Sequence, residues 1–197
     1  MKSMLVKVTG ISPLIQQADV LADPIHPMTL ALRSATSKAA KNRTDEDWKY
    51  IEACEMRAQL YWDDSVGVHI PESNMMKCLI EGARLTKQGK NIERGLFIAQ
   101  DMIPLTYRDG KVRDVESLIK DPRFKYRKTV VVGKARSPRA RPIFRDWSCE
   151  LEINYDPQII KNDAHVMEML TVAGSYVGIG GRRIGKGGRF GRFEVSQ

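Results

Sequence analysis

The sequence predicts an α+β fold in which helices cover one face of an antiparallel sheet. Three observations lead to this prediction. Strand-like segments stand near the two ends of the chain, at Met4–Gly10 and Phe193–Val195. Residues 147–155 alternate strictly between apolar and polar side chains, which is typical of a strand with one buried and one solvent-facing side. Three segments with helical periodicity lie between the terminal strands.

The N-terminal quarter of the chain begins with a strand and continues irregularly. Met4–Gly10 is rich in β-branched residues, ends in glycine and is followed by Ser12-Pro13, a turn signal. Asp23-Pro24 and His26-Pro27 then interrupt any regular element. We therefore expect an excursion that contains only a short helix near Met28–Ser34.

The clearest helix spans residues 44–62. Thr44 suits the N-cap position, and three acidic residues follow in the first turn, where the helix dipole favours negative charge. Residues 66–70 predict a short strand. Pro71 then opens a second helix that ends near Leu85, since proline is favourable in a first helical turn.

The second half of the chain adds strands and one more helix. Arg108–Lys111 predicts a hairpin turn, and Thr129–Gly133 predicts a strand. After the strand at 147–155, Asn162 or Asp163 caps a last helix, which a glycine-rich loop and the terminal strand follow.

This order of elements predicts a ferredoxin-like sandwich with an inserted basic hairpin. We expect one domain over residues 1–197, with insertions at about 18–45 and 100–142. Its core would include Trp48, Trp62 and Trp147, although an exposed tryptophan is also able to stack on a nucleic-acid base.

The net charge of +8 is concentrated in two segments. Residues 122–145 contain nine Lys or Arg and no acid, and residues 178–192 contain five basic residues and seven glycines. Such a localised basic surface predicts a polyanionic partner. Glycine lets the backbone approach a ligand, and arginine donates forked hydrogen bonds to phosphate.

These residue types define the predicted nucleic-acid site. The floor would be the loop, and the clamp would be the arginines of the 122–145 segment. The floor residues are Gly180, Gly181, Arg182, Arg183, Lys186, Gly187, Gly188, Arg189 and Arg192, and the clamp residues are Arg136, Arg139 and Arg141. The alternatives are a tightly packed turn for the loop and a solvated charged face for the clamp. Gly185-Lys186 lacks the following Ser or Thr of a nucleotide-binding P-loop.

Other classes of function find little support. Three dispersed cysteines show no metal-ligand spacing and fit a reducing compartment. We recognise neither a signal peptide nor a long apolar run in the sequence, and we expect a cytoplasmic protein with no membrane partner. No cofactor motif is recognisable, and we expect neither a cofactor nor a metal ion.

The end of the chain resembles the RAMP superfamily of CRISPR proteins. In residues 165–195 a helix, a glycine-rich basic loop and a short strand follow one another as they do where that family closes its ferredoxin-like fold. His69–Leu79 resembles a second family segment, in which a strand, Ile-Pro and polar residues lead into a helix. The chain is also similar to small phage and prophage proteins that begin with Val-Thr-Gly-x-Ser-Pro-Leu and end with Gly-Arg-Phe-Glu-Val.

The resemblance implies that the protein binds single-stranded nucleic acid, RNA in preference to DNA, on its sheet and glycine loop, and we expect this binding to be non-catalytic. It further implies a basic finger, for which Arg136–Pro142 is the candidate, and self-assembly along the bound strand. Two alternatives stay open. One is a phage-borne mimic of a CRISPR subunit that contacts CRISPR-type proteins. The other is a metal-independent endoribonuclease, for which His69 and His26 are the candidate catalytic residues.

Overall fold

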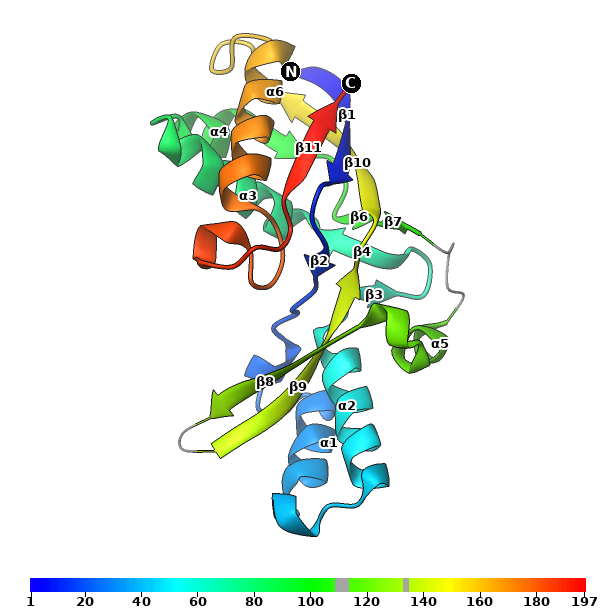
Figure 1. Cartoon of the computed structure of the whole chain (residues 1–197). Coiled ribbons are helices and arrows are strands. Elements are labelled where there is room, and N and C mark those ends of the chain that lie inside the picture. The colour runs from blue at the N-terminus through cyan, green and yellow to red at the C-terminus, as the bar shows by residue number, and fades with distance from the viewer. Residues whose placement is uncertain (109–113, 133–134) are drawn as a thin grey trace. The chain divides into compact units, whose positions relative to one another are not determined.

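A computed structural model of the chain describes residues 1–108, 114–132 and 135–197 (Figure 1). It combines helices with antiparallel sheets, which confirms the predicted α+β class. The chain divides into two compact units. The sheet unit comprises Met1–Ile15, Trp62–Lys111 and Phe144–Gln197, and the hairpin unit comprises Gln16–Tyr61 and Val112–Ile143. A single domain with two insertions stays a prediction.

The sheet unit is built on an antiparallel sheet with the strand order β11-β1-β10-β5, and β7 also pairs with β10. Val6 of β1 stands opposite Leu151 of β10, and Val8 stands opposite Cys149. The three strands predicted around residues 4–10, 147–155 and 193–195 are therefore confirmed. The strand bounds are β1 (Lys2–Gly10), β5 (Leu96–Ile98), β7 (Thr106–Tyr107), β10 (Trp147–Tyr155) and β11 (Phe193–Ser196).

Helices cover one face of this sheet. They are α3 (Glu72–Leu85), α4 (Gly89–Gly95) and α6 (Asp163–Val172), which a π-helical turn, η4 (Ala173–Val177), extends. The alternate residues of β1 and β10 that include Val6 and Leu151 are buried, whereas their neighbours on the opposite face are mostly exposed. The helices therefore pack on the buried side, as the sequence predicts.

A second, smaller sheet also belongs to the sheet unit. Its strands are β3 (Trp62–Asp63), β4 (Gly67–Pro71) and β6 (Met102–Pro104). The short β2 (Leu14–Ile15) of the same unit is not part of this sheet, and both of its residues are buried. Ile70 pairs with Ile103, and both side chains are buried. The predicted turn at 108–111 extends into residues that lie outside the described part of the chain.

The hairpin unit consists of three helices and the basic hairpin. Its elements are α1 (Pro27–Thr36), α2 (Asp45–Gln59), α5 (Val115–Lys120), β8 (Lys125–Val132) and β9 (Ala135–Phe144), with short 3-10 turns η1 (Val20–Ala22), η2 (Ala40–Asn42) and η3 (Pro122–Phe124). Helix α2 begins as predicted, because the Thr44 hydroxyl accepts the Asp47 amide and the Asp47 carboxylate accepts the Thr44 amide. It ends at Gln59, three residues before the predicted end. Met56, Ile119 and Ala140 form an apolar cluster that joins α2, α5 and the hairpin.

None of the helices in the described residues is long and apolar enough to cross a lipid bilayer.

Candidate functional site

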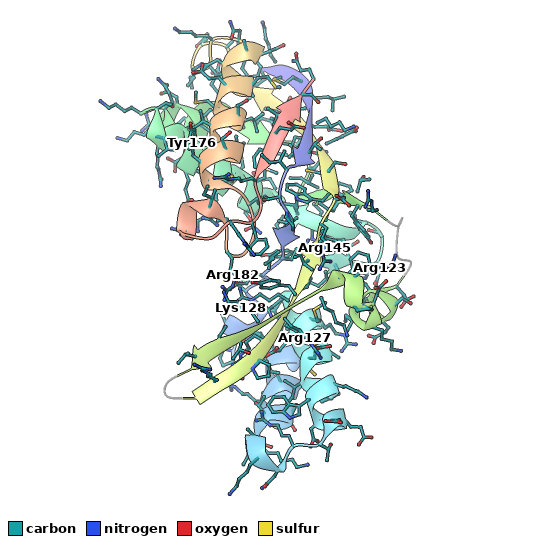
Figure 2. All side chains as sticks on the ribbon, viewed as in Figure 1. Arg123, Arg127, Lys128, Arg145, Tyr176 and Arg182 are labelled. Atoms are coloured by element: carbon teal, nitrogen blue, oxygen red, sulfur yellow. The ribbon has the colours of Figure 1, made fainter. Side chains whose placement is uncertain are left out.

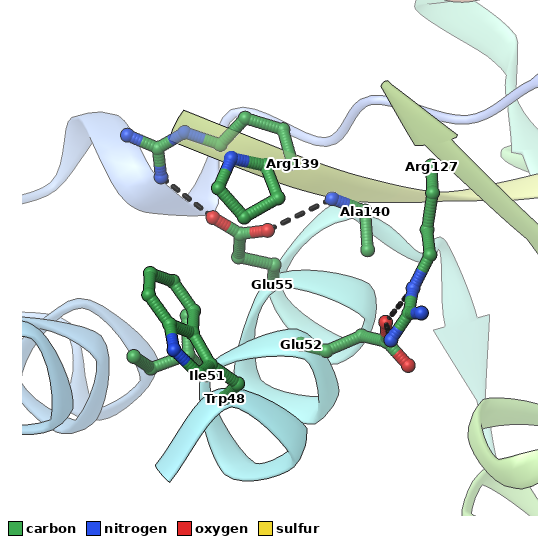
Figure 3. A pocket seen from close by; sticks show the side chains of 8 residues that line it. Trp48, Ile51, Glu52, Glu55, Arg127, Arg139 and Ala140 are labelled. Carbon is green, nitrogen blue, oxygen red and sulfur yellow. Dashed lines mark hydrogen bonds and ion pairs between the residues drawn. The ribbon is translucent and has the colours of Figure 1, made fainter. Parts of the chain in front are cut away.

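The basic hairpin is held to helix α2 by two glutamates. Glu55 accepts hydrogen bonds from Arg139 Nη1 at 2.6 Å and from the Ala140 amide at 2.9 Å (Figure 3). Glu52 accepts Lys125 Nζ at 2.8 Å and also pairs with Arg127. The two glutamates of α2 therefore neutralise part of the hairpin's positive charge.

Strand pairing decides which cations share a face of the hairpin. Lys128 stands opposite Arg139 and Tyr126 stands opposite Arg141, so these four residues lie on one face. Arg127 alternates with them and lies on the face that meets α2 (Figure 2). Lys128 is exposed. The sequence analysis missed this lysine, although its place in a run of basic residues before a predicted strand was a usable signal.

The three predicted clamp arginines all lie on β9, but they differ in their surroundings. Arg136 is exposed near the start of the strand, opposite Val131, and by alternation it lies on the other face of the hairpin from Arg139 and Arg141. Arg139 is tied to Glu55. Arg141 is partly exposed beside the Tyr126 position. We name Lys128, Arg136, Arg139 and Arg141 the hairpin cations.

The predicted floor of the site is a compact loop whose amides are mostly engaged within the sheet unit. The amide of Gly181 donates to the Ile15 carbonyl at 2.7 Å, and the amide of Gly188 donates to the Arg183 carbonyl at 3.0 Å. The amide of Gly191 donates to the Pro13 carbonyl at 2.9 Å. The amides of Gly181 and Gly188 are therefore not free to donate to an anion.

Close packing explains most of the glycines in this loop. Gly180 has a φ of +80°, and a Cβ there would stand 2.4 Å from the Ile15 carbonyl oxygen. Gly191 has a φ of +72°, and a Cβ there would stand 1.8 Å from the Ile179 carbonyl oxygen. Gly187 also has a positive φ, but the space around it is open. The packed-turn alternative from the sequence analysis thus describes the backbone of the loop.

The basic side chains of the loop divide into supporting and exposed groups. Arg183 Nη2 pairs with the Glu81 carboxylate of α3 at 2.8 Å, and Arg182 is partly exposed with a φ of +54°. Lys186, Arg189 and Arg192 are exposed. The loop therefore offers side chains, rather than backbone amides, to a polyanion.

The open face of the main sheet carries the opposite charge. Lys7 stands opposite Glu150, Leu5 opposite Glu152, and Thr9 opposite Glu194. Three glutamates thus share this face with one lysine, and Glu150, Glu152 and Glu194 are all exposed. Because such a surface repels phosphate, the sheet face implied by the RAMP resemblance is not part of the candidate site.

The candidate catalytic histidines make structural contacts in different units. His26 Nδ1 accepts the Met28 amide at 3.1 Å and caps α1. His69 on β4 is 8% exposed, and its Nδ1 lies 3.2 Å from the Gly67 carbonyl oxygen. Within the described residues, no group of three or more His, Cys, Asp or Glu side chains is placed to hold a metal ion.

Comparison with known proteins adds no relative. No protein-family model matches the chain, and no curated protein is detectably similar to it. The RAMP relationship stays a prediction, and the function proposed below rests on the charges and contacts described above, except for its preference for RNA.

Proposed function

We propose that this protein binds single-stranded nucleic acid through the phosphate backbone, RNA in preference to DNA. The carrying observation is the set of hairpin cations on a two-stranded ribbon whose 122–145 segment contains no acid. The preference for RNA comes from the RAMP resemblance alone.

The ribbon suits a strand laid along it. Arg139 and Arg141 are two residues apart on β9, so their side chains leave the same face about 6.6 Å apart. Lys128 extends this group from the neighbouring strand. A guanidinium group donates forked hydrogen bonds to phosphate oxygens, and such phosphate contacts do not read the base sequence. Binding is therefore directed at the backbone.

The topology of the sheet unit supports a ferredoxin-like fold, which we include in the proposal. In the order β11-β1-β10-β5 all neighbouring strands are antiparallel, α3 and α4 lie between β1 and β5 in sequence, and α6 lies between β10 and β11. This order is compatible with a β-α-β-β-α-β unit, between whose elements further short strands are placed in the sequence. The fold hosts many functions and does not by itself identify one.

The double variant Lys128→Ala with Arg136→Ala tests the proposal. Binding to RNA and single-stranded DNA oligonucleotides is measured by fluorescence anisotropy between about 50 and 200 mM salt. Each lost phosphate contact reduces the slope of log affinity against log salt by about 0.7. We therefore expect a reduction of about 0.7 for a strand that follows the Lys128 face alone, and of about 1.4 for a strand that also contacts Arg136 on the other face.

The matched control is Lys90→Ala with Lys161→Ala, which removes the same charge from exposed positions of the sheet unit. If both double variants flatten the slope equally, net charge rather than the hairpin governs binding. A wild-type protein that ignores RNA and single-stranded DNA at low salt overturns the proposal.

A protein-contact role has one supporting observation of its own. Leu5 and Phe97 are 65% and 48% exposed on the open, acidic face of the main sheet. Apolar side chains ringed by charge are typical of protein interfaces. In this alternative, the protein captures host proteins even after nuclease treatment. The variant Leu5→Ser with Phe97→Ser loses this capture, whereas the variant Lys128→Ala with Arg136→Ala keeps it.

A further inference from the structure

The hairpin unit contains a groove that shares only Arg139 with the proposed backbone contacts. Two adjoining cavities, of about 340 and 350 Å³, share Trp48, Ile51, Glu55, Pro138 and Arg139 in their walls. Both reach the size of about 300 Å³ or more that is usual for small-ligand sites. We name their common space the Trp48 groove. It lies between α2 and strand β9, as Figure 3 shows for the first cavity.

Trp48 provides the groove with a flat aromatic wall. It stands in the first turn of α2 and is partly exposed, whereas Trp147 is 3% exposed in the core of the sheet unit. The guanidinium carbon of Arg43 lies 4.7 Å from the centre of the Trp48 ring. Arg43 is in turn fixed by hydrogen bonds to the Thr36 and Lys38 carbonyls at 2.8 and 2.9 Å. The indole is thus held in place by its surroundings.

The charges around the groove favour an anion. The walls of the two cavities carry four arginines and two glutamates, namely Arg33, Arg43, Arg127, Arg139, Glu52 and Glu55. Glu55 already accepts Arg139 and the Ala140 amide. Arg33 Nη1 donates to the Pro24 carbonyl at 3.3 Å, and the partners of Arg43 are also carbonyls. Because carbonyl oxygens carry no net charge, these hydrogen bonds do not neutralise the positive charges of Arg33 and Arg43, which can attract an anionic ligand.

We propose that the Trp48 groove receives one nucleotide of the bound strand, with its base stacked on the indole and its phosphate near Arg33 and Arg43. The inference rests on the proposed function, because Arg139 belongs both to the groove and to the hairpin cations. Every base offers a π-face to an indole, so stacking adds affinity without sequence preference. Glu52 and Glu55 already accept hydrogen bonds from Arg127 and Arg139, so they are not available to recognise the edge of a base. We therefore expect weak discrimination between bases.

The test compares an ordinary oligonucleotide with an abasic strand of equal length, which keeps the phosphates and removes the bases. The proteins are the wild type, Trp48→Leu and the control Trp62→Phe, whose tryptophan donates to Asp64 in a turn of the sheet unit. We expect the wild type and Trp62→Phe to bind the abasic strand roughly 5- to 100-fold more weakly. Trp48→Leu should bind both strands alike.

A second measurement does not depend on the leucine variant folding normally. Tryptophan fluorescence of the wild type and of Trp62→Phe should fall as the ordinary strand binds, and the more conservative Trp48→Phe should lose this quenching. Equal binding of the two strands by the wild type, with a salt slope that still depends on Lys128 and Arg136, overturns the groove inference and leaves the proposed function standing. Failure to bind either strand overturns both.

Discussion

Glu55 on α2 and Arg139 on β9 form an ion pair, at 2.6 Å, in which the carboxylate is 3% exposed and also accepts the Ala140 amide. The sequence suggested that Arg139 serves a ligand. The structure shows that it also neutralises a buried acid, so loss of this arginine has two consequences.

Arg139→Ala should lower the stability of the protein as well as its affinity for nucleic acid. The substitution leaves the Glu55 carboxylate buried with the Ala140 amide as its remaining hydrogen-bond donor, which costs about 1–3 kcal/mol. Arg136→Ala removes an exposed cation and should change the unfolding free energy by less than about 0.5 kcal/mol. Urea unfolding of the two variants measures the difference. Equal unfolding midpoints would show that the Glu55 pair contributes nothing to folding.

The same distinction separates the arginines of the glycine loop. Arg189 and Arg192 are exposed, and replacing both by Ala should weaken binding and reduce the salt slope by about 1.4 without moving the unfolding midpoint. Arg183→Ala should instead lower the midpoint, because Glu81 loses its partner. Fluorescence anisotropy and thermal unfolding are measured on the wild type and on both variants. Unchanged binding in the Arg189 and Arg192 variant removes the loop from the site.

Local signals explain which parts of the fold were predictable. The Thr44 cap acts within one turn of helix, and the alternation at residues 147–155 reports directly on burial, so both elements were found. The pairing of Glu55 with Arg139 joins residues 84 apart in sequence, and no local pattern encodes it. The division into two units depends on many such distant contacts and was not predicted either.

The candidate site was predictable in composition but not in detail. The nine basic residues and the lack of acid in residues 122–145 located the three arginines among the hairpin cations, but not Lys128. Composition did not show which of them α2 neutralises. The sequence left two roles open for the loop's glycines, since a glycine that permits close ligand approach and one that permits close packing look alike in sequence.

Two glycines of the loop should therefore differ sharply in their tolerance of alanine. At Gly191 a Cβ would meet the Ile179 carbonyl oxygen at 1.8 Å, in addition to the strain of a positive φ. At Gly187 the space is open, and the cost is the strain alone, about 1–2 kcal/mol. Thermal unfolding and amide hydrogen exchange should show a larger loss for Gly191→Ala. Equal losses would mean that the loop is not packed as described.

The raised pKa values of the buried Cys78 and Cys149 thiols make the stability of the protein depend on pH in the alkaline range. Burial raises the pKa of Cys149 from 9.0 to about 12, and the nearby Glu150 adds to the shift. Burial likewise raises the pKa of Cys78 to about 12. Between pH 9 and 12 the unfolded chain therefore binds fewer protons than the native protein, and stability falls as pH rises.

Above pH 9 each thiol should reduce the unfolding free energy by up to about 1.4 kcal/mol per pH unit. Urea unfolding at about pH 8, 9 and 10 measures the wild-type slope, and Cys149→Ala should have a shallower one at the upper end whatever its absolute stability. The comparison ends at pH 10 because of Tyr155, whose pKa the hydrogen bond to Asp163 raises from 10.0 to about 12. Above pH 10 the unfolded chain loses this phenol proton while the native protein keeps it, so the tyrosine would also contribute to the slope. Parallel slopes for the wild type and Cys149→Ala would show that this thiol ionises as readily in the native protein as in the unfolded chain. In that case water would reach the Cys149 side chain on the helix-covered face of β10.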